Sequence, residues 1–319
     1  MNGPLSRALD PVIAAILLAP AWLMQRARKH GLEKLPVTQR ALLGVGVLPI
    51  RDHYYEPQFR PGDLTPERLS QERILPGIDM RLDAEKELLR RFRFQAELSH
   101  LPFSQPEGRD DVYWFDNTYF QRMDGSIWYS MLRLLKPRQI IEVGSGFSTL
   151  LARHALERNA TEPGGHLAQH LCIEPYERPW LERSGAEIVR KRVEEVDLAI
   201  FDGLSEGDVL FIDSSHVLRP GGDVAMEILQ ILPRLKPGVV VHVHDIFTPR
   251  DYPWEWLFQM QRLWNEQYAL EAFLTLNPAF EVMLGVQYVW HAAREEVEAA
   301  CVPLEGQIPG TSFYIRRVR

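Results

Sequence analysis

Residues 140–151 constrain the fold of this chain more than any other segment. They begin as a short run of apolar residues that ends in two glycines one residue apart, Gly144 and Gly146, and a helical pattern follows directly. Gly144 permits a tight turn, and Gly146 lets the backbone approach a ligand that lies across the end of the strand. The segment therefore predicts a strand–turn–helix unit that binds a ligand at the edge of an α/β sheet.

Apolar runs of strand length recur beyond residue 117 and alternate with helical stretches. The predicted strands are residues 139–143, 170–173, 187–189, 208–212 and 239–243, and the predicted helices are residues 149–158, 179–184, 223–235 and 254–274. This alternation is typical of a parallel sheet with helices on both faces, whose strands are buried on both sides. Two later runs, 280–286 and 312–315, complete a doubly wound, Rossmann-like sheet of seven mostly parallel strands.

The first third of the chain has a different character. Prolines and glycines divide residues 1–110 into short pieces, which predicts an irregular helical accessory segment in front of a sheet domain at 111–319. Residues 83–98 are the best helix candidate within it. Residues 11–24 form an apolar helix, shorter than the ~20 residues that span a bilayer. Two interpretations stay open: this helix packs on the protein's own core, or it lies in a membrane interface.

Composition excludes some classes of partner. The net charge is −7 and the pI is about 5.8, so a nucleic-acid partner bound through phosphate neutralisation is not expected. There are two cysteines, and Cys172 lies in an apolar run, so a disulfide framework is not expected either. This pattern fits a cytoplasmic protein. Whether residues 11–24 also make peripheral contact with a membrane stays open.

Two details of the glycine turn distinguish its ligand from a dinucleotide. The third glycine of the dinucleotide pattern is missing, and Ser148 or Thr149 stands where the helix begins. Glu142 lies inside the strand just before the turn, where it would attract a cationic amino-acid group and repel a pyrophosphate. A further acid, Glu174, ends the second strand, where a carboxylate can accept both hydroxyls of a ribose. These features predict a cationic nucleoside cofactor.

Four polar residues follow the fourth and fifth predicted strands. They are Asp213, His216, His244 and Asp245. Because neighbouring parallel strands end at the same edge of a sheet, we expect them to converge beside the cofactor. A histidine with a near-neutral pKa can take a proton from a hydroxyl, and a divalent cation held by carboxylates can instead lower the pKa of that hydroxyl.

The motifs IIEVGSGFST, CIEPYE, DVLFIDSSH and PGVVVHVHDIF, in this order, resemble the class I S-adenosylmethionine-dependent methyltransferases, in their small-molecule and sugar O-methyltransferase branch. The resemblance covers residues 117–319. It implies S-adenosyl-L-methionine as cofactor, Glu174 on its ribose, and Val193 with Glu194 near the adenine. The residues that it implies around the methionine part and the transferred methyl are Glu142, Gly144, Ser145, Gly146, Ser148, Thr149 and Asp213.

The Asp213-x-x-His216 segment resembles that of macrolide-sugar O-methyltransferases. The resemblance implies that Asp213 is a metal ligand and His216 the general base. Those enzymes carry an acidic pair after the next strand, where this chain has His244 and Asp245 as further candidate ligands. Imidazole suits Mn²⁺ or Fe²⁺ better than Mg²⁺, so the metal stays open.

The acceptor is expected to be a hydroxyl of a small molecule or glycan. Two alternatives remain. One is a metal-dependent hydroxylase of the cephalosporin-tailoring group, which shares this fold. The other is a non-catalytic assembly protein at the membrane periphery that uses residues 11–24 to bind lipid.

Overall fold

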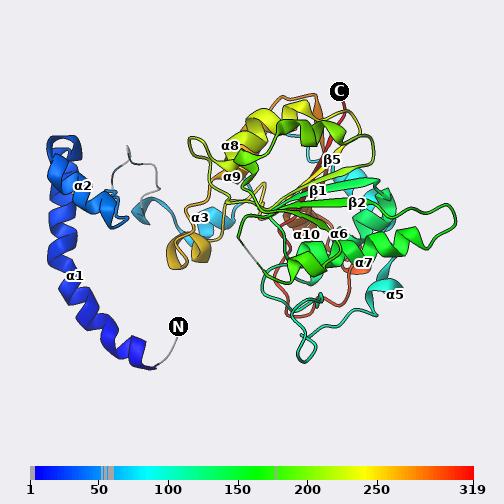
Figure 1. Cartoon of the computed structure of the whole chain (residues 1–319), viewed down its shortest axis with the longest axis horizontal. Helices are drawn as coiled ribbons and strands as arrows, with labels where there is room; N and C mark the ends of the chain where they lie inside the picture. Colours follow the sequence, from blue (N-terminus) through cyan, green and yellow to red (C-terminus); the bar gives the residue numbers. More distant parts are fainter. Residues whose placement is uncertain (1–3, 52, 54–55, 57–60, 177) are drawn as a thin grey trace. The chain divides into compact units, whose positions relative to one another are not determined.

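The computed structural model describes residues 4–51, 53, 56, 61–176 and 178–319. The chain divides into two compact units, Met1–Arg68 and Leu69–Arg319 (Figure 1). The first unit contains α1 (Pro4–His30), α2 (Pro36–Gly44) and short 3₁₀ turns at Leu32–Lys34 and Pro61–Asp63, and α3 (Pro66–Ser70) crosses the boundary. Arg28 and Arg51 both pair with the buried Glu56, which ties the end of α1 to the segment that follows α2.

Helix α1 is longer than the sequence pattern predicted. It runs for 27 residues through Pro11 and Pro20, because the polar residues that flank the apolar run are themselves good helix formers. Its stretch Leu9–His30, 22 residues, is long and apolar enough to cross a membrane by length and composition, and no part of its apolar window is buried. The predicted helix bounds, 11–24, are therefore too narrow.

The second unit is built around one seven-stranded sheet in the order β3-β2-β1-β4-β5-β7-β6. The five strands β1 to β5 run parallel, and β7 pairs antiparallel with both β5 and β6. This confirms the predicted α/β fold. The strands are β1 (Gln139–Val143), β2 (Gln169–Ile173), β3 (Glu187–Val189), β4 (Val209–Ile212), β5 (Val240–Val243), β6 (Phe280–Gly285) and β7 (Phe313–Arg317).

Helices cover both faces of the sheet, as its continuous apolar strands require. Ile140 packs in one hydrophobic cluster and its neighbour Ile141 in the other, because successive side chains of a strand point to opposite faces. The first cluster includes α4 (Leu82–Arg90), α6 (Arg122–Leu135), α7 (Phe147–Ala160), α10 (Val286–Ala292) and α11 (Arg294–Ala300). The second includes α8 (Asp223–Met226), its π-helical and 3₁₀ continuations Glu227–Ile231 and Leu232–Arg234, and α9 (Glu266–Leu274).

The predicted domain boundary at residue 110 lies too late in the chain. Residues 69–110 belong to the sheet unit, because polar contacts join them to its far strand and to α9. Arg81 pairs with Glu281, and the buried Glu85 accepts a hydrogen bond of 2.8 Å from the backbone N–H of Gly285. These partners are about two hundred residues apart in sequence, so local proline punctuation cannot reveal that they pack together.

Two predicted helices are interrupted. Residues 83–98 form α4 and the short α5 (Gln95–Leu98), which lets both Phe92 and Leu98 enter the core although they would point to different sides of a straight helix. Residues 254–274 form a π-helical turn, Glu255–Gln259, and then α9. The second break occurs because the carbonyl of His216 accepts hydrogen bonds from the N–H groups of Asn265 and Glu266, and this starts a new helix. The predicted helix 179–184 is only a 3₁₀ turn, Leu181–Arg183.

Candidate active site

A cavity of about 320 Å³ opens at the carboxyl ends of β1, β2 and β4. Five residues that the sequence predicted for the cofactor line it together: Gly144, Glu174, Val193, Glu194 and Asp213. Its wall also contains residues that the sequence analysis did not single out, among them Tyr176, Arg192, Ser215, Arg219 and Asp223. The strand ends therefore converge on one cavity, as the parallel topology requires.

Position 144 requires a glycine, both for its backbone conformation and for the lack of space around it. Its φ of +80° lies in the left-handed region, and a Cβ atom added there would lie 1.9 Å from the backbone oxygen of Asp213. Its N–H donates to the carbonyl of Ile173 over 3.1 Å. The turn thus passes tightly between the ends of β2 and β4. By contrast, a Cβ at Gly146 would meet only the Arg178 side chain, at 3.6 Å.

Glu174 is held at the edge of this cavity by the turn itself. Its Oε2 accepts a hydrogen bond from the N–H of Ser145 over 3.2 Å, and its Oε1 accepts one from the N–H of Tyr176 over 3.0 Å. The side chain is buried, and these two bonds fix the position of its carboxylate at the cavity wall.

Other predicted cofactor residues lie beneath the turn and do not line the cavity. The fully buried Glu142 accepts a hydrogen bond of 2.7 Å from the Thr149 hydroxyl and lies 2.9 Å from Nε2 of His170. Thr149 in turn accepts from the N–H of Gly146, and the carbonyl of the buried Ser148 accepts from the indole of Trp128. These side chains support the turn. Ser145 and Gly146 form the turn itself, so their contact with a cofactor stays a prediction.

A second cavity, of about 390 Å³, lies beside the first. The four polar residues predicted at the ends of β4 and β5 all line it: Asp213, His216, His244 and Asp245. Asp213 lines both cavities. The rest of the second wall is partly aromatic and includes Tyr119, Trp256, Arg262 and Trp264.

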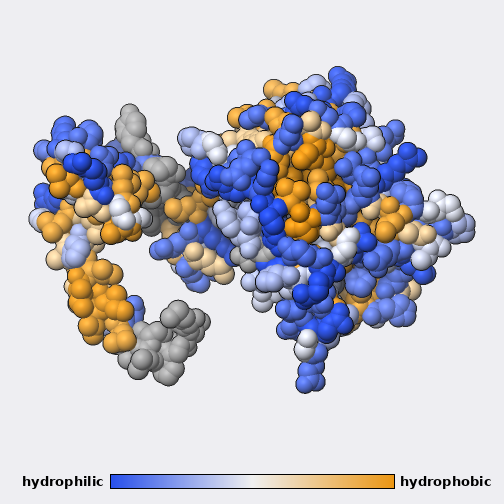
Figure 2. Space-filling model, in the orientation of Figure 1, coloured by the Kyte–Doolittle hydropathy of each residue, from blue (hydrophilic) through white to orange (hydrophobic). Residues whose placement is uncertain are grey.

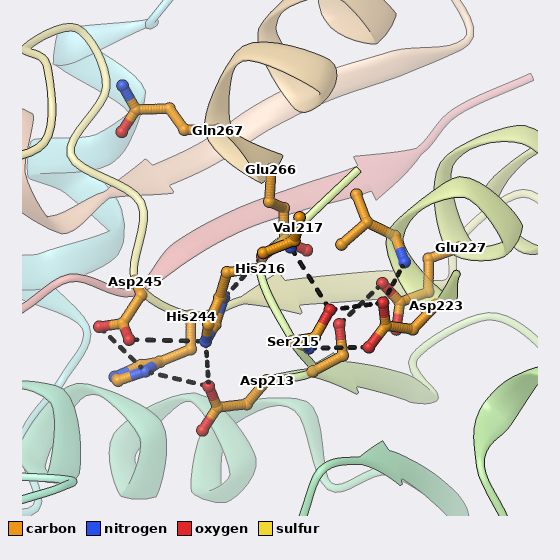
Figure 3. Close-up of polar contacts among 12 residues, drawn as sticks. Asp213, Ser215, His216, Val217, Asp223, Glu227, His244, Asp245, Glu266 and Gln267 are labelled. Carbon is orange, nitrogen blue, oxygen red and sulfur yellow. Dashed lines mark hydrogen bonds and ion pairs between the residues drawn. The ribbon is translucent and has the colours of Figure 1, made fainter. Parts of the chain in front are cut away.

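Both histidines face the two aspartates (Figure 3). The Nε2 atom of His216 lies 3.3 Å from Oδ1 of Asp213 and 3.6 Å from Oδ2 of Asp245. The Nδ1 atom of His244 lies 3.6 Å from Oδ1 of Asp213 and 3.5 Å from Oδ1 of Asp245. His216 and Asp245 have φ values of +60° and +58°, a left-handed conformation that costs free energy in residues with a Cβ. Such strain is concentrated at functional sites.

Two further carboxylates complete the cluster, and the sequence analysis did not identify them. Glu266, at the start of α9, lies 2.8 Å from Nδ1 of His216 through its Oε2. Asp124, on α6, lies 3.6 Å from Nε2 of His244 and accepts hydrogen bonds from the N–H groups of Thr311 and Ser312. Neither residue belongs to a strand-end motif. No local pattern distinguishes Glu266 from the other polar residues of its helix, Gln267 and Glu271.

The acidic and imidazole groups of this cluster shift one another's pKa values and so keep one another charged. Burial alone would raise the pKa of Asp213, but the charge of His244 and hydrogen bonds from both histidines hold it well below its ordinary value. Burial alone would lower the pKa of His216, yet its hydrogen bonds to Asp213 and Glu266 raise it well above its ordinary value. The pKa of His244 is likewise raised against the effect of burial, chiefly by the charges of Asp245 and Asp213.

The donor set fits a divalent cation. One side-chain donor atom each of Asp213, His216 and Asp245 lies within 4.8 Å of the other two, close enough for one ion to contact all three. The buried Nδ1 atom of His244 points between the same aspartates, 3.6 Å from Oδ1 of Asp213 and 3.5 Å from Oδ1 of Asp245. Carboxylates also outnumber histidines in this cluster, so an added positive charge would be stabilised there.

Two residues near the cluster have structural roles, and a third lines the second cavity. His242 is fully buried and stacks on Tyr314 with ring centroids 4.2 Å apart, so it is a packing residue. The amide of Asn117 hydrogen-bonds the carbonyls of Trp114 and Phe120 and organises the backbone there. Tyr119 is two-thirds exposed and reaches the second cavity.

Comparison with known proteins agrees with this architecture. Residues 141–246 match the family model described as a methyltransferase domain. An uncharacterized protein of Archaeoglobus fulgidus is 24% identical over 164 residues, which are 48% of this chain and 72% of that protein.

Solved structures that are similar to this chain include two O-methyltransferases and CmcI. An O-methyltransferase from Bacillus cereus in complex with SAH is 14% identical, with a TM-score of 0.37, over 77% of this chain and 94% of that one. The O-methyltransferase TomG from Streptomyces achromogenes in complex with SAM is 16% identical, with a TM-score of 0.37, over 76% and 91%. CmcI, solved with Mg and SAM, is 14% identical, with a TM-score of 0.37, over 70% and 84%.

The sheet order provides the structural counterpart of the family match. Five parallel strands are followed by a last strand that inserts antiparallel between β5 and β6, which gives the predicted sheet of seven mostly parallel strands. The glycine turn, the cofactor-side cavity and the β4 end all lie within residues 141–246. The chain therefore has an α/β sheet of seven strands, and residues 141–246 within it match the model of a methyltransferase domain.

Proposed function

We propose that this protein transfers a methyl group from S-adenosyl-L-methionine to a hydroxyl group of a small molecule or glycan. The observation that carries the proposal is the position of Asp213, which lines both the cavity at the glycine turn and the cavity that holds the two histidines. A group transfer needs two substrates whose reacting atoms meet, and two cavities that share one wall residue provide such a place.

The first cavity suits a cationic nucleoside. Glu174 would accept the ribose hydroxyls, and Val193 with Glu194 would contact the adenine. Acids outnumber bases along this wall, where Glu174, Glu194, Asp213 and Asp223 face Arg192 and Arg219. This balance favours a sulfonium with an amino-acid chain over a pyrophosphate.

His216 is the proposed general base. Its Nδ1 is held by Glu266, so that imidazole carries its proton there and Nε2 is directed at the acceptor cavity. Nε2 would accept the proton of the acceptor hydroxyl while the oxygen forms a bond to the methyl carbon and the carbon–sulfur bond breaks. The products are a methyl ether, S-adenosylhomocysteine and a proton on His216.

In this proposal a cation would be held by Asp213, Asp245 and Nδ1 of His244, which lies 3.6 Å and 3.5 Å from the two carboxylates. Nε2 of His216 lies near the same carboxylates but is kept for the proton, because one nitrogen lone pair cannot bind both. When bound, the cation would neutralise these carboxylates, lower the pKa of an acceptor hydroxyl and return the pKa of His216 toward neutrality. The chain's own residues then orient the acceptor. Trp256 and Trp264 offer ring faces, and the guanidinium of Arg262 lies 4.3 Å and 4.6 Å from their centroids. A flat or sugar-like ring with an anionic substituent would match this wall.

A second candidate function rests on the same donors. Two histidines and an aspartate, here His216, His244 and Asp245, are the ligand types of non-haem iron oxygenases. A metal-dependent hydroxylase of the cephalosporin-tailoring type is therefore the alternative. Dependence on Fe²⁺ and O₂, with no S-adenosylhomocysteine formed, would favour it.

Calorimetric titration with S-adenosylmethionine tests the proposed cofactor. We expect binding by the unaltered protein and at least tenfold weaker binding by Glu174→Ala, because the ribose acceptors are lost. Glu174→Gln keeps an acceptor for the turn N–H groups and separates loss of the ribose contact from loss of the turn. Glu187→Gln, at an exposed position of β3, is the matched control. Absence of heat with the unaltered, folded protein would overturn the proposal.

A further inference from the structure

The first unit carries an apolar surface that the proposed chemistry does not use. In the stretch Leu9–His30, none of the apolar window is buried. A core helix of a soluble protein would be mostly covered by its neighbours. We propose that α1 crosses a lipid bilayer and anchors the methyltransferase domain on the cytoplasmic side of the membrane.

The length of the helix matches a bilayer. At ~1.5 Å per residue, a helix as long as this stretch rises about 33 Å, against a hydrocarbon thickness of about 30 Å. Pro11 and Pro20 lie inside the helix without ending it. Prolines of this kind are tolerated more readily in spanning helices than in soluble ones.

The distribution of apolar residues favours spanning over lying in the interface. Ile16 and Leu18 are 66% and 70% exposed and lie about 200° apart around the helix, and residues 11–24 contain no charged side chain. An interfacial helix needs one polar face in contact with water. Figure 2 shows apolar side chains gathered along α1. Because the apolar surface surrounds the helix, only a position inside the hydrocarbon would cover it.

The charges next to the helix indicate its direction. Arg26, Arg28 and Lys29 lie in the last turns of the stretch Leu9–His30, after the uncharged residues 11–24, whereas the residues before 11–24 include one basic side chain, Arg7. Basic residues flanking a span remain on the cytoplasmic side. The guanidinium of Arg26 lies 4.8 Å from the Trp22 ring centroid, and tryptophan with a basic neighbour is typical of the membrane–water boundary. This end leads to the methyltransferase domain.

The full chain, expressed in bacteria, tests the anchor by extraction. We expect the protein to stay in the membrane pellet after alkaline carbonate washing, which removes peripheral proteins. The double variant Ile16→Lys/Leu18→Lys should lose most of this retention. Ile74→Lys/Leu276→Lys places the same two substitutions at apolar positions of the second unit that are 92% and 82% exposed, and it should remain in the pellet. Recovery of the unaltered protein in the supernatant of the carbonate wash would overturn the proposal.

Labelling with a membrane-impermeant maleimide distinguishes a span from an interfacial helix. The native Cys172 and Cys301 are both buried, so background reaction is low. Asp10→Cys should react only from outside intact spheroplasts, and Lys29→Cys only in inverted vesicles. Reaction of both introduced cysteines from the same side of the membrane would contradict a span. Loss of an N-terminal tag would show that the helix is removed by cleavage, and it would also contradict the proposal.

Discussion

The Nδ1 atom of His216 lies 2.8 Å from Oε2 of Glu266, and the carbonyl of His216 accepts hydrogen bonds from the N–H groups of Asn265 and Glu266. His216 is thus held twice by the start of α9, through its ring and through its strained backbone at φ +60°. A ring fixed in this way presents Nε2 in one direction. Glu266 is therefore a positioning residue for the proposed base.

Replacement of this pair should separate chemistry from cofactor binding. We expect His216→Ala to lower kcat by about 10²- to 10⁴-fold and Glu266→Gln by about 10- to 100-fold, with nearly unchanged affinity for S-adenosylmethionine in calorimetry. Because Glu266 helps to raise the pKa of His216, Glu266→Gln should also move the acid limb of the kcat profile to lower pH. Loss of cofactor binding in a folded His216→Ala variant would mean that His216 has a different role.

The two glycines of the turn should respond differently to alanine. Gly144→Ala places a Cβ against the Asp213 backbone at a positive φ, so we expect it to lower the free energy of unfolding by at least about 2 kcal/mol and to abolish cofactor binding. Gly146→Ala has room and should fold normally, which chemical denaturation can verify. Weakened cofactor binding by a stable Gly146→Ala variant would then report close approach of the ligand to this backbone. Equal stability of both variants would contradict the geometry of the turn.

Removal of divalent cations should stop turnover if the cluster holds a metal. We expect EDTA to reduce activity at least tenfold, and Mn²⁺ or Fe²⁺ to restore it better than Mg²⁺, because His244 stands beside Asp245. Asp245→Asn should raise the metal concentration needed for half-maximal activity. Asp110→Asn, whose side chain is 71% exposed, is the control. Full activity in EDTA would remove the metal from the mechanism.

Glu85 should make stability depend on pH. Burial raises its pKa to about 8 from 4.5, so the folded protein holds a proton that the unfolded chain releases. Its stabilising effect is complete below about pH 4.5 and is lost as pH rises to about 8, by at most about 1.4 kcal/mol per unit. Glu85→Gln should therefore unfold at higher denaturant concentration than the native protein at about pH 9, and with less difference at about pH 5. Glu87→Gln, 68% exposed, should show no such dependence.

The fold and much of the candidate site could be predicted from local sequence pattern. Strand β1 and strand β3 have the predicted bounds, and the other strands differ by one or a few residues at their ends. Buried parallel strands leave continuous apolar runs, and the polar residues directly after them must lie at one sheet edge. For this reason Gly144, Glu174, Asp213 and Asp245 were all found at the cavities.

The remaining features of the fold and of the candidate site depend on contacts between segments that are distant in sequence. Glu266 and Asp124 lie 50 residues or more from the histidines that they hold, and the break that begins α9 depends on the carbonyl of His216. The boundary at residue 68 likewise depends on pairs such as Glu85 with Gly285. By itself the sequence determined which residues end the strands, because that follows from hydrophobic periodicity along the chain. The tertiary structure alone decided which carboxylates surround His216 and His244, because those contacts arise only when helices pack across the finished sheet.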